Sequence, residues 1–196
     1  MIQLNLPTGE PIRLNSSPAR KFRGVRIPGS VLHKAERNGY AITEHEYNQD
    51  SFSLSFRNFH FPAEITLINT EKINWVRLET VLSGELRIKN PDGKVTQLLP
   101  GQYHLTDTPI FQTQFSKAQT CTYFSAYYSS EFLSMLGLPI TVTPITPRPL
   151  PMAKQELIYE FLDNPFDNDS YLVILVQAIK YVICYRKITS LVMRNK

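Results

Sequence analysis

Residues 81–109 constrain the fold more than any other part of the chain. In the stretch VLSGELRIKNPDGKVTQLLPGQYHLTDTP, short apolar runs alternate with turn signals at Gly84, at residues 90–93 and at Gly101. Strands joined by turns as short as these pair as antiparallel neighbours. The stretch therefore predicts a meander of three short strands, which is a building unit of β-sandwiches and small barrels.

Further strands are predicted on both sides of this stretch, because apolar and polar residues alternate there. They cover residues 40–47, 51–61, 65–68, 75–82, 111–115 and 120–128. Within 51–61 the alternation shifts by one residue near Asn58, which predicts a bulge or a bend. Residues 1–38 carry four prolines and no sustained periodicity, so we expect them to be irregular. Eight or nine short strands between residues 40 and 128 favour an all-β sandwich or barrel.

The pattern becomes helical after residue 128. Residues 129–131 are a predicted helix start, with a serine cap before Phe132. Residues 139–151 hold five prolines in thirteen positions and predict an extended connector. Two more helices are expected within 152–196, the last of them apolar around most of its surface. We therefore divide the chain into a barrel with an irregular N-terminal segment (1–138), a proline-rich connector (139–151) and a helical region (152–196).

The apolar surface of the last helix has two interpretations that stay open. It either joins two copies of the chain or packs back on the barrel of its own chain. The candidate contact residues of a dimer are Leu172, Leu175, Ile179 and Ile183.

The charge and the cysteine content of the chain exclude few classes of protein. The formal net charge of +4 comes partly from two basic clusters, near residues 20–26 and 186–196. Neither contains a DNA-reading motif, so we interpret both as solvated surface. Cys121 and Cys184 lie among apolar neighbours, which favours two buried thiols and leaves a disulfide open. Because no secretory signal and no run long enough to span a bilayer is visible, we expect a cytoplasmic protein.

The turn residues also resemble a known family pattern. The cupin barrel pattern is matched by Leu82-Ser83-Gly84-Glu85-Leu86, Asp92-Gly93, Leu99-Pro100-Gly101-Gln102-Tyr103 and Pro109. The order of barrel and then helices, over residues 40–190, resembles the N-terminal effector-binding module of AraC-type transcription regulators. The resemblance implies a mainly β, cupin-like barrel of the jelly-roll type followed by a helical pair. It also implies binding of a small-molecule effector and homodimerisation through the helices. Contact with DNA would need a helix-turn-helix domain, for which this chain has no room, and no membrane partner is expected.

The family's metal site is not matched. Metal-binding cupins carry a His-x-His and a Glu on the strand before the conserved glycine, whereas residues 73–80 contain no histidine and His104 stands alone after Pro-Gly. A divalent ion needs three or four converging ligands. We therefore predict no metal, no cofactor and no enzyme activity. The alternatives are a stand-alone cupin enzyme or binding protein for a sugar-like or other polar metabolite, and a basic barrel that binds nucleic acid directly.

Trp75, Arg77 and Glu79 lie on one face of one predicted strand, because side chains alternate along a strand. If this face points inward, it offers a stacking surface, a cation and an acceptor to a polar ligand such as a sugar or an acid. If it points outward, the core is filled by Val76, Leu78 and Thr80. The outward orientation is physically simpler and is favoured.

Three further residues complete the candidate ligand site. His104 and Thr106 share a face, and we expect His104 to be a partly exposed strand residue rather than a hydrogen-bonding group inside the barrel. Tyr127 is a candidate lining residue, although core packing is the more frequent role of such a tyrosine. Glu44 and Glu46 are assigned to a strand edge and to no site.

Overall fold

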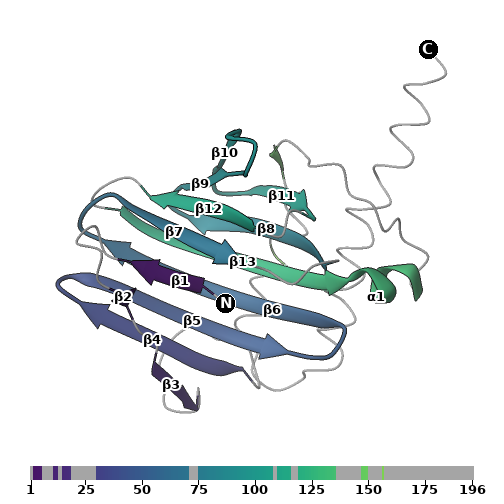
Figure 1. The fold of residues 1–196 in the computed structure, drawn as a ribbon, viewed down its shortest axis with the longest axis horizontal. Helices are drawn as coiled ribbons and strands as arrows, with labels where there is room; N and C mark the ends of the chain where they lie inside the picture. Colours follow the sequence, from purple (N-terminus) through teal and green to yellow (C-terminus); the bar gives the residue numbers. More distant parts are fainter. Residues whose placement is uncertain are drawn as a thin grey trace.

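The structure is a computed structural model that describes residues 2–5, 11–12, 15–18, 30–70, 75–107, 110–115, 119–135 and 147–149, and residue 156. These parts are almost entirely β-structure with one short helix (Figure 1). The elements are β1 (Ile2–Asn5), β2 (Pro11–Ile12), β3 (Asn15–Pro18), β4 (Val31–Arg37), β5 (Tyr40–Asn48), β6 (Phe52–Phe61), β7 (Ile65–Thr70), β8 (Trp75–Ser83), β9 (Leu86–Lys89), β10 (Val95–Leu98), β11 (Gln102–Thr106), β12 (Ile110–Phe115), β13 (Gln119–Ser129), α1 (Ser130–Met135) and β14 (Arg148–Pro149).

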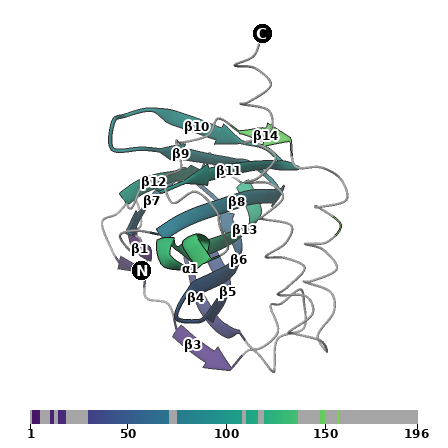
Figure 2. The ribbon, with the colours of Figure 1, turned by 90° about the vertical axis from the view of Figure 1, so that its right-hand side faces the viewer.

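Two antiparallel sheets face each other across the interior. One has six strands in the order β10-β9-β12-β7-β1-β2. The other has eight, in the order β14-β11-β8-β13-β6-β5-β4-β3. The mainly β architecture predicted from the sequence is confirmed. Figure 2 views the same two layers from the side, with α1 at the end of β13.

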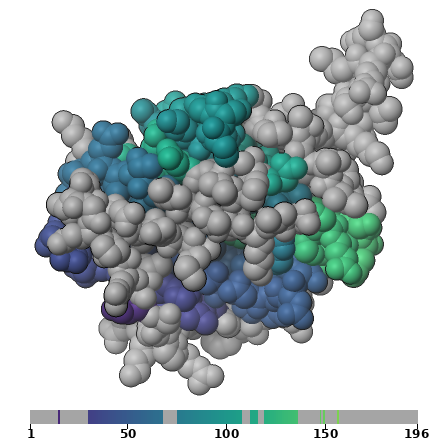
Figure 3. Space-filling model, viewed as in Figure 1, coloured from purple at the N-terminus to yellow at the C-terminus, as the bar shows by residue number. Residues whose placement is uncertain are grey.

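The predicted meander is wrong, although its turns are placed correctly. β9 and β10 form an antiparallel hairpin in the six-stranded sheet, whereas β8 and β11 pair with each other in the eight-stranded sheet. The chain therefore leaves the large sheet after β8 and returns to it beside the strand that it left. The hairpin stands at the molecular surface, in teal in Figure 3.

Gly84 makes this change of sheet sterically feasible. Its φ of 81° lies in the left-handed region, and a Cβ built on it would come within 2.3 Å of the carbonyl oxygen of Thr120. Only glycine combines this backbone conformation with so close an approach of a neighbouring strand. The turn at Gly84 thus bends the chain out of the plane of the sheet, where a hairpin turn would have folded it back within the plane.

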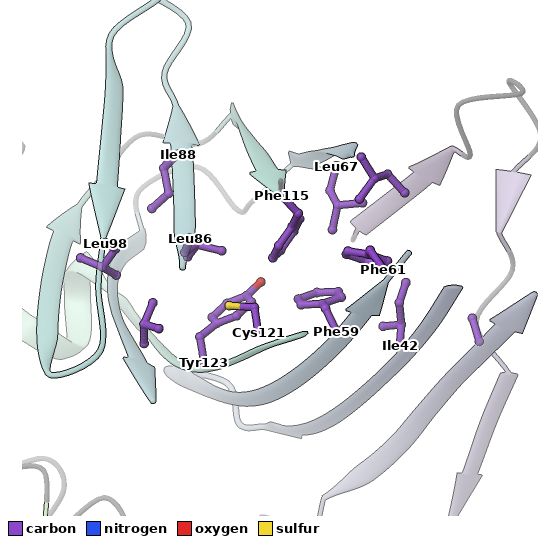
Figure 4. Close-up of a cluster of buried hydrophobic side chains, with 13 residues drawn as sticks. Ile42, Phe59, Phe61, Leu67, Leu86, Ile88, Leu98, Phe115, Cys121 and Tyr123 are labelled. Atoms are coloured by element: carbon purple, nitrogen blue, oxygen red, sulfur yellow. The ribbon is translucent and has the colours of Figure 1, made fainter. Parts of the chain in front are cut away.

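An aromatic cluster fills one end of the interior (Figure 4). The ring centroids of Phe59 and Phe115 are 5.0 Å apart, and Tyr123 stacks on Phe59 at 5.5 Å. Aliphatic side chains from the six-stranded sheet, such as Leu67, complete the cluster. Cys121 is fully buried in it, as predicted, and burial raises the pKa of its thiol to about 12. Cys184 lies outside the described residues.

The bulge predicted near Asn58 is also wrong. β6 pairs with β5 and β13 without interruption, and the register irregularity lies instead between Thr122 and Tyr123, where β13 meets β8. The apolar residues of β6 change faces because both faces of this strand are buried. Its first half is apolar on the outer face, and its second half is apolar toward the interior.

The N-terminal prediction needs correction too. The described parts of residues 1–38 contain strands β1 to β4, which extend both sheets at their edges. Hydrogen bonds to neighbouring strands stabilise these segments, and such nonlocal partners leave no periodic pattern in so short a stretch.

The transition to helix occurs where the sequence predicts it. The hydroxyl of Ser129 accepts a hydrogen bond from the backbone N–H of Phe132 at 3.1 Å, which caps α1. In the predicted connector, β14 is extended and pairs with β11. The predicted helices of residues 152–196 and the contact residues Leu172, Leu175, Ile179 and Ile183 lie outside the described residues, apart from residue 156. The described part of the chain contains no helix with the length and hydrophobicity that crossing a membrane requires.

Candidate functional site

The inner face of the eight-stranded sheet can be followed from strand to strand by its register. Arg57 on β6 lies directly opposite Glu44 on β5 and Tyr123 on β13. Residues opposite each other in antiparallel strands point to the same side of the sheet. Because Tyr123 belongs to the aromatic cluster, this row of side chains faces the interior. The interior is therefore apolar at one end and carries charged groups at the other.

The first ion pair joins Arg57 to Glu44, and each residue is only 5% exposed. Arg57 Nε donates to Glu44 Oε1 at 2.6 Å, and the hydroxyl of Ser55 donates to the same oxygen at 2.8 Å. Arg57 Nη1 also donates to the hydroxyl oxygens of Tyr123 and Tyr127, at 3.2 and 3.1 Å. Burial alone would raise the pKa of Glu44, but the charge of Arg57 and these hydrogen bonds outweigh it and lower that pKa.

The second group lies on the adjacent strands β8 and β11. Glu79 Oε2 is 3.2 Å from Arg77 Nε and 3.8 Å from His104 Nδ1, and all three side chains are at most 2% exposed. Burial would again raise the pKa of Glu79. The Arg77 charge and the neighbouring His104 outweigh it, so that the carboxylate stays ionised inside the protein.

Five of the six ligand-site residues predicted from the sequence meet on this inner face. In the register, Arg77 lies opposite Thr106 on one side and Tyr127 on the other, and Glu79 lies opposite His104. All five are at most 6% exposed. Trp75, the sixth, stands at the beginning of β8 and is partly exposed. The structure brings these residues together but does not test whether they bind a ligand.

Two expectations about their orientation are wrong. The outward orientation favoured for Arg77 and Glu79 fails because β8 is a central strand that is buried on both faces. Val76 and Leu78, which this orientation would have placed in the interior, are instead buried on the outer face. His104, expected to be partly exposed, is 1% exposed because it lies opposite Glu79 and so shares the inner face of the sheet.

Sequence reasoning missed the other half of the cluster. Glu44, which the sequence analysis places at a strand edge, is buried between two neighbouring strands. Glu46 is half-buried, and its Oε2 lies 3.1 Å from His33 Nε2. A signal was present in β6, where Ser55 and Arg57 alternate with the buried phenylalanine and leucine residues of the other face. Since that other face is apolar, the polar positions had to face either solvent or an enclosed polar interior.

The chemistry available here is polar binding. The cluster offers two guanidinium groups, two carboxylates, an imidazole and several hydroxyl groups in a volume shielded from water. Within the described part of the chain, no three His, Cys, Asp or Glu side chains are grouped so that they could hold a metal ion. The absence of a metal and of a cofactor stays a prediction.

Comparisons with known proteins place the fold. No family model matches the chain, and no curated protein matches it. The crystal structure of the AraC-like transcriptional activator CuxR is similar with a TM-score of 0.54 and 11% identity, covering 75% of this chain and 56% of that one. The chain thus spans little more than half of CuxR. A Cupin_2 domain of an XRE family regulator from Enterobacter cloacae matches with a TM-score of 0.38 and 17% identity, covering 46% of this chain and 97% of that one.

The EutQ protein of Clostridium difficile matches with a TM-score of 0.35 and 13% identity, over 46% of this chain and 69% of that one. At identities this low the comparisons show only a similarity of fold, and this conclusion rests on the match to CuxR. The resemblance to a cupin-like domain of AraC-type regulators, which the turn pattern predicts, is thereby confirmed as a resemblance of fold.

Proposed function

We propose that this chain is the small-molecule-sensing and dimerisation part of an AraC-type transcription regulator, and that it is a binding module rather than an enzyme. The carrying observation is the buried charged cluster inside the barrel. Burying charges costs free energy that an apolar filling would avoid. A barrel that keeps two ion pairs and a histidine in its interior therefore has groups suited to recognising a polar ligand.

A route from the cluster to the helical region supports this proposal. His104 lies on β11, whose residues Gln102 and Tyr103 pair with β14. In sequence, β14 directly precedes the region 152–196 that we expect to form the dimer. A ligand that shifts β11 relative to β8 would move β14 with it. Ligand binding would thus change the population of two arrangements of the paired chains.

Three parts of the proposal rest on sequence alone. The dimer would form through Leu172, Leu175, Ile179 and Ile183. Contact with DNA would occur only through a separate domain, and the protein would act in the cytoplasm.

Ligand screening by thermal unfolding tests the sensing function. We expect at least one class among sugars, carboxylic acids, amino acids and nucleotides to raise the melting temperature in a concentration-dependent way. A ligand at 100 times its Kd stabilises the folded state by about 2.7 kcal/mol. Arg77→Lys, which keeps a positive charge beside Glu79, should weaken the effect, whereas Arg87→Lys, in a surface ion pair with Glu85, should preserve it. A chain that no compound stabilises would contradict the sensing function, and a chain that is monomeric by sedimentation would contradict the dimerisation function.

Metal analysis distinguishes the proposed binding module from the enzyme alternative. The proposed binding module should purify without a stoichiometric divalent ion when no chelator is used. One tightly bound ion per chain would favour a cupin-type enzyme instead.

A further inference from the structure

Three polar side chains form one transverse row on the inner face of the large sheet. Ser125 on β13 lies directly opposite Glu79 on β8, and Glu79 lies directly opposite His104 on β11. None of the three is more than 1% exposed. The row continues on β6 with Ser55, which faces Ser125 from the other side.

The hydrogen-bonding capacity of this row is incompletely used. Among the described residues, none forms a hydrogen bond with Ser125 Oγ, with His104 Nδ1 or with Glu79 Oε2, although Arg77 and His104 lie within ion-pair distance of that carboxylate oxygen. Ser55, by contrast, donates its hydroxyl hydrogen to Glu44. Buried polar atoms almost always have a partner in the protein, in ordered water or in a ligand. Three such atoms from neighbouring strands therefore mark a place where a polar group would find hydrogen-bond partners.

The charge balance of the interior restricts what that group can be. In the described part of the barrel, Arg57 is paired with Glu44, and Arg77 is paired with Glu79. A carboxylate or an ammonium group entering this region would add a buried charge, and the guanidinium and carboxylate groups described there are already paired with each other. An uncharged hydroxyl group adds none. It can donate to the Glu79 carboxylate and accept from the hydroxyl of Ser125.

We propose that Ser125, Glu79 and His104 bind a hydroxyl group of an uncharged, hydroxyl-rich ligand, and that the paired charges around them exclude organic acids. The inference rests on the proposed sensing function and specifies its ligand class. Glu79 accepts the hydrogen of the ligand hydroxyl. Ser125 donates a hydrogen bond to the oxygen of the same ligand hydroxyl. The imidazole of His104, on the other side of Glu79, orients the carboxylate.

A pair of serine substitutions tests the first half of the proposal without any ligand. Ser55→Ala removes a hydroxyl that bonds to Glu44 and should lower the melting temperature by about 2–4 °C. Ser125→Ala removes a buried hydroxyl for which the fold provides no hydrogen bond, so the melting temperature should stay unchanged or rise. If Ser125→Ala lowers it as much as Ser55→Ala does, the hydroxyl has a partner within the fold and the proposal is overturned.

Matched probes test the ligand class on the wild-type chain. We expect glucose, xylitol or myo-inositol to raise the melting temperature, and glucuronate and gluconate to have no effect at the same concentrations. Ser125→Ala should weaken binding of the stabilising compound about 5- to 10-fold, as expected for one lost hydrogen bond.

The outcomes separate this inference from the proposed function. Stabilisation by the acids but not by the uncharged probes would overturn the ligand class and leave the sensing function standing. The same holds if no uncharged probe acts and a compound of another class stabilises the chain. If nothing stabilises the chain at all, both fail.

Discussion

The ion pair between Arg57 and Glu44 yields the sharpest test of how this barrel is built. Arg57→Met keeps much of the side-chain length and removes the charge. Among the described residues, the Glu44 carboxylate, which is 5% exposed, then loses the hydrogen bond from Arg57 and keeps the one from Ser55. The hydroxyl groups of Tyr123 and Tyr127 lose their shared donor.

The expected loss follows from these contacts. Leaving one member of a buried ion pair without its partner costs about 3–5 kcal/mol. Each of the two tyrosine hydrogen bonds contributes about 0.5–1.5 kcal/mol. We therefore expect Arg57→Met to lower the free energy of unfolding by about 4–8 kcal/mol, which is close to the total stability of many domains.

Neutralising the second member should recover part of this loss. In the double variant Glu44→Gln/Arg57→Met no buried carboxylate remains unpaired, so it should be about 2–3 kcal/mol more stable than Arg57→Met alone. Urea unfolding of the wild type, both single variants and the double variant gives the coupling energy. Arg87→Met, in a partly exposed pair with Glu85, serves as the control and should cost less than about 1 kcal/mol.

One result would refute the reasoning. If the double variant is no more stable than Arg57→Met, the cost of the single substitution does not come from a stranded carboxylate. The interior around Glu44 would then be wet enough to solvate it, and the electrostatic description of the cluster would fail.

Three further predictions follow from other features. Left-handed strain alone should cost an alanine about 1–2 kcal/mol, and Gly93→Ala, with a φ of 82° and nothing within 4 Å of the new Cβ, should cost only that. Gly84→Ala should cost more, because its Cβ would also meet a backbone oxygen of β13. The urea midpoints of the two variants test this difference. The pKa values of Glu44 and Glu79 are lowered in the folded state, so the stabilisation from these carboxylates is complete above the unfolded pKa of about 4.3 and is lost as the pH falls through the folded values. The free energy of unfolding, measured from about pH 6 to pH 3, should show this loss. Glu79→Gln should make the free energy of unfolding depend less steeply on pH. Ile179→Asp, on the helix predicted outside the described residues, should halve the mass measured by sedimentation, and an unchanged mass with the fold intact would count against that helix as an interface.

Local features of the fold could be predicted from the sequence because they are encoded locally. The turns at Gly84, at residues 90–93 and at Gly101 are placed correctly, since each needs a particular backbone conformation. The cap at Ser129 is likewise a matter of a few adjacent residues. The strands of residues 40–128 follow from alternation.

Strand pairing could not be predicted in the same way. β8 pairs with β11 and β13, which are reached only after the chain has visited the other sheet. The hairpin β9–β10 would look the same in sequence if all of these strands belonged to one sheet. The meander prediction failed because a short turn fixes a change of direction without fixing the plane in which it occurs.

The candidate site was half predicted for a related reason. Alternation indicates that Arg77 and Glu79 share a face, but it does not show which face is enclosed. A charged pair on a strand usually faces solvent, and this expectation fails only where both faces are covered. Arg77 and Glu79 are spaced two residues apart and carry opposite charges, so each offers the other a partner in the interior.

The division of the interior into an apolar end and a charged end explains how buried charges can coexist with a stable barrel. The aromatic cluster around Phe59 buries a continuous apolar volume at one end, and this burial provides the free energy of folding. The ion pairs at the other end contribute little net stability, because their attraction only offsets their desolvation. An interior divided in this way can lose or rearrange polar contacts at one end while the other end holds the two sheets together. Substitutions in the aromatic cluster should therefore unfold the protein, whereas a ligand at the charged end can alter the arrangement of β8 and β11 within a folded barrel.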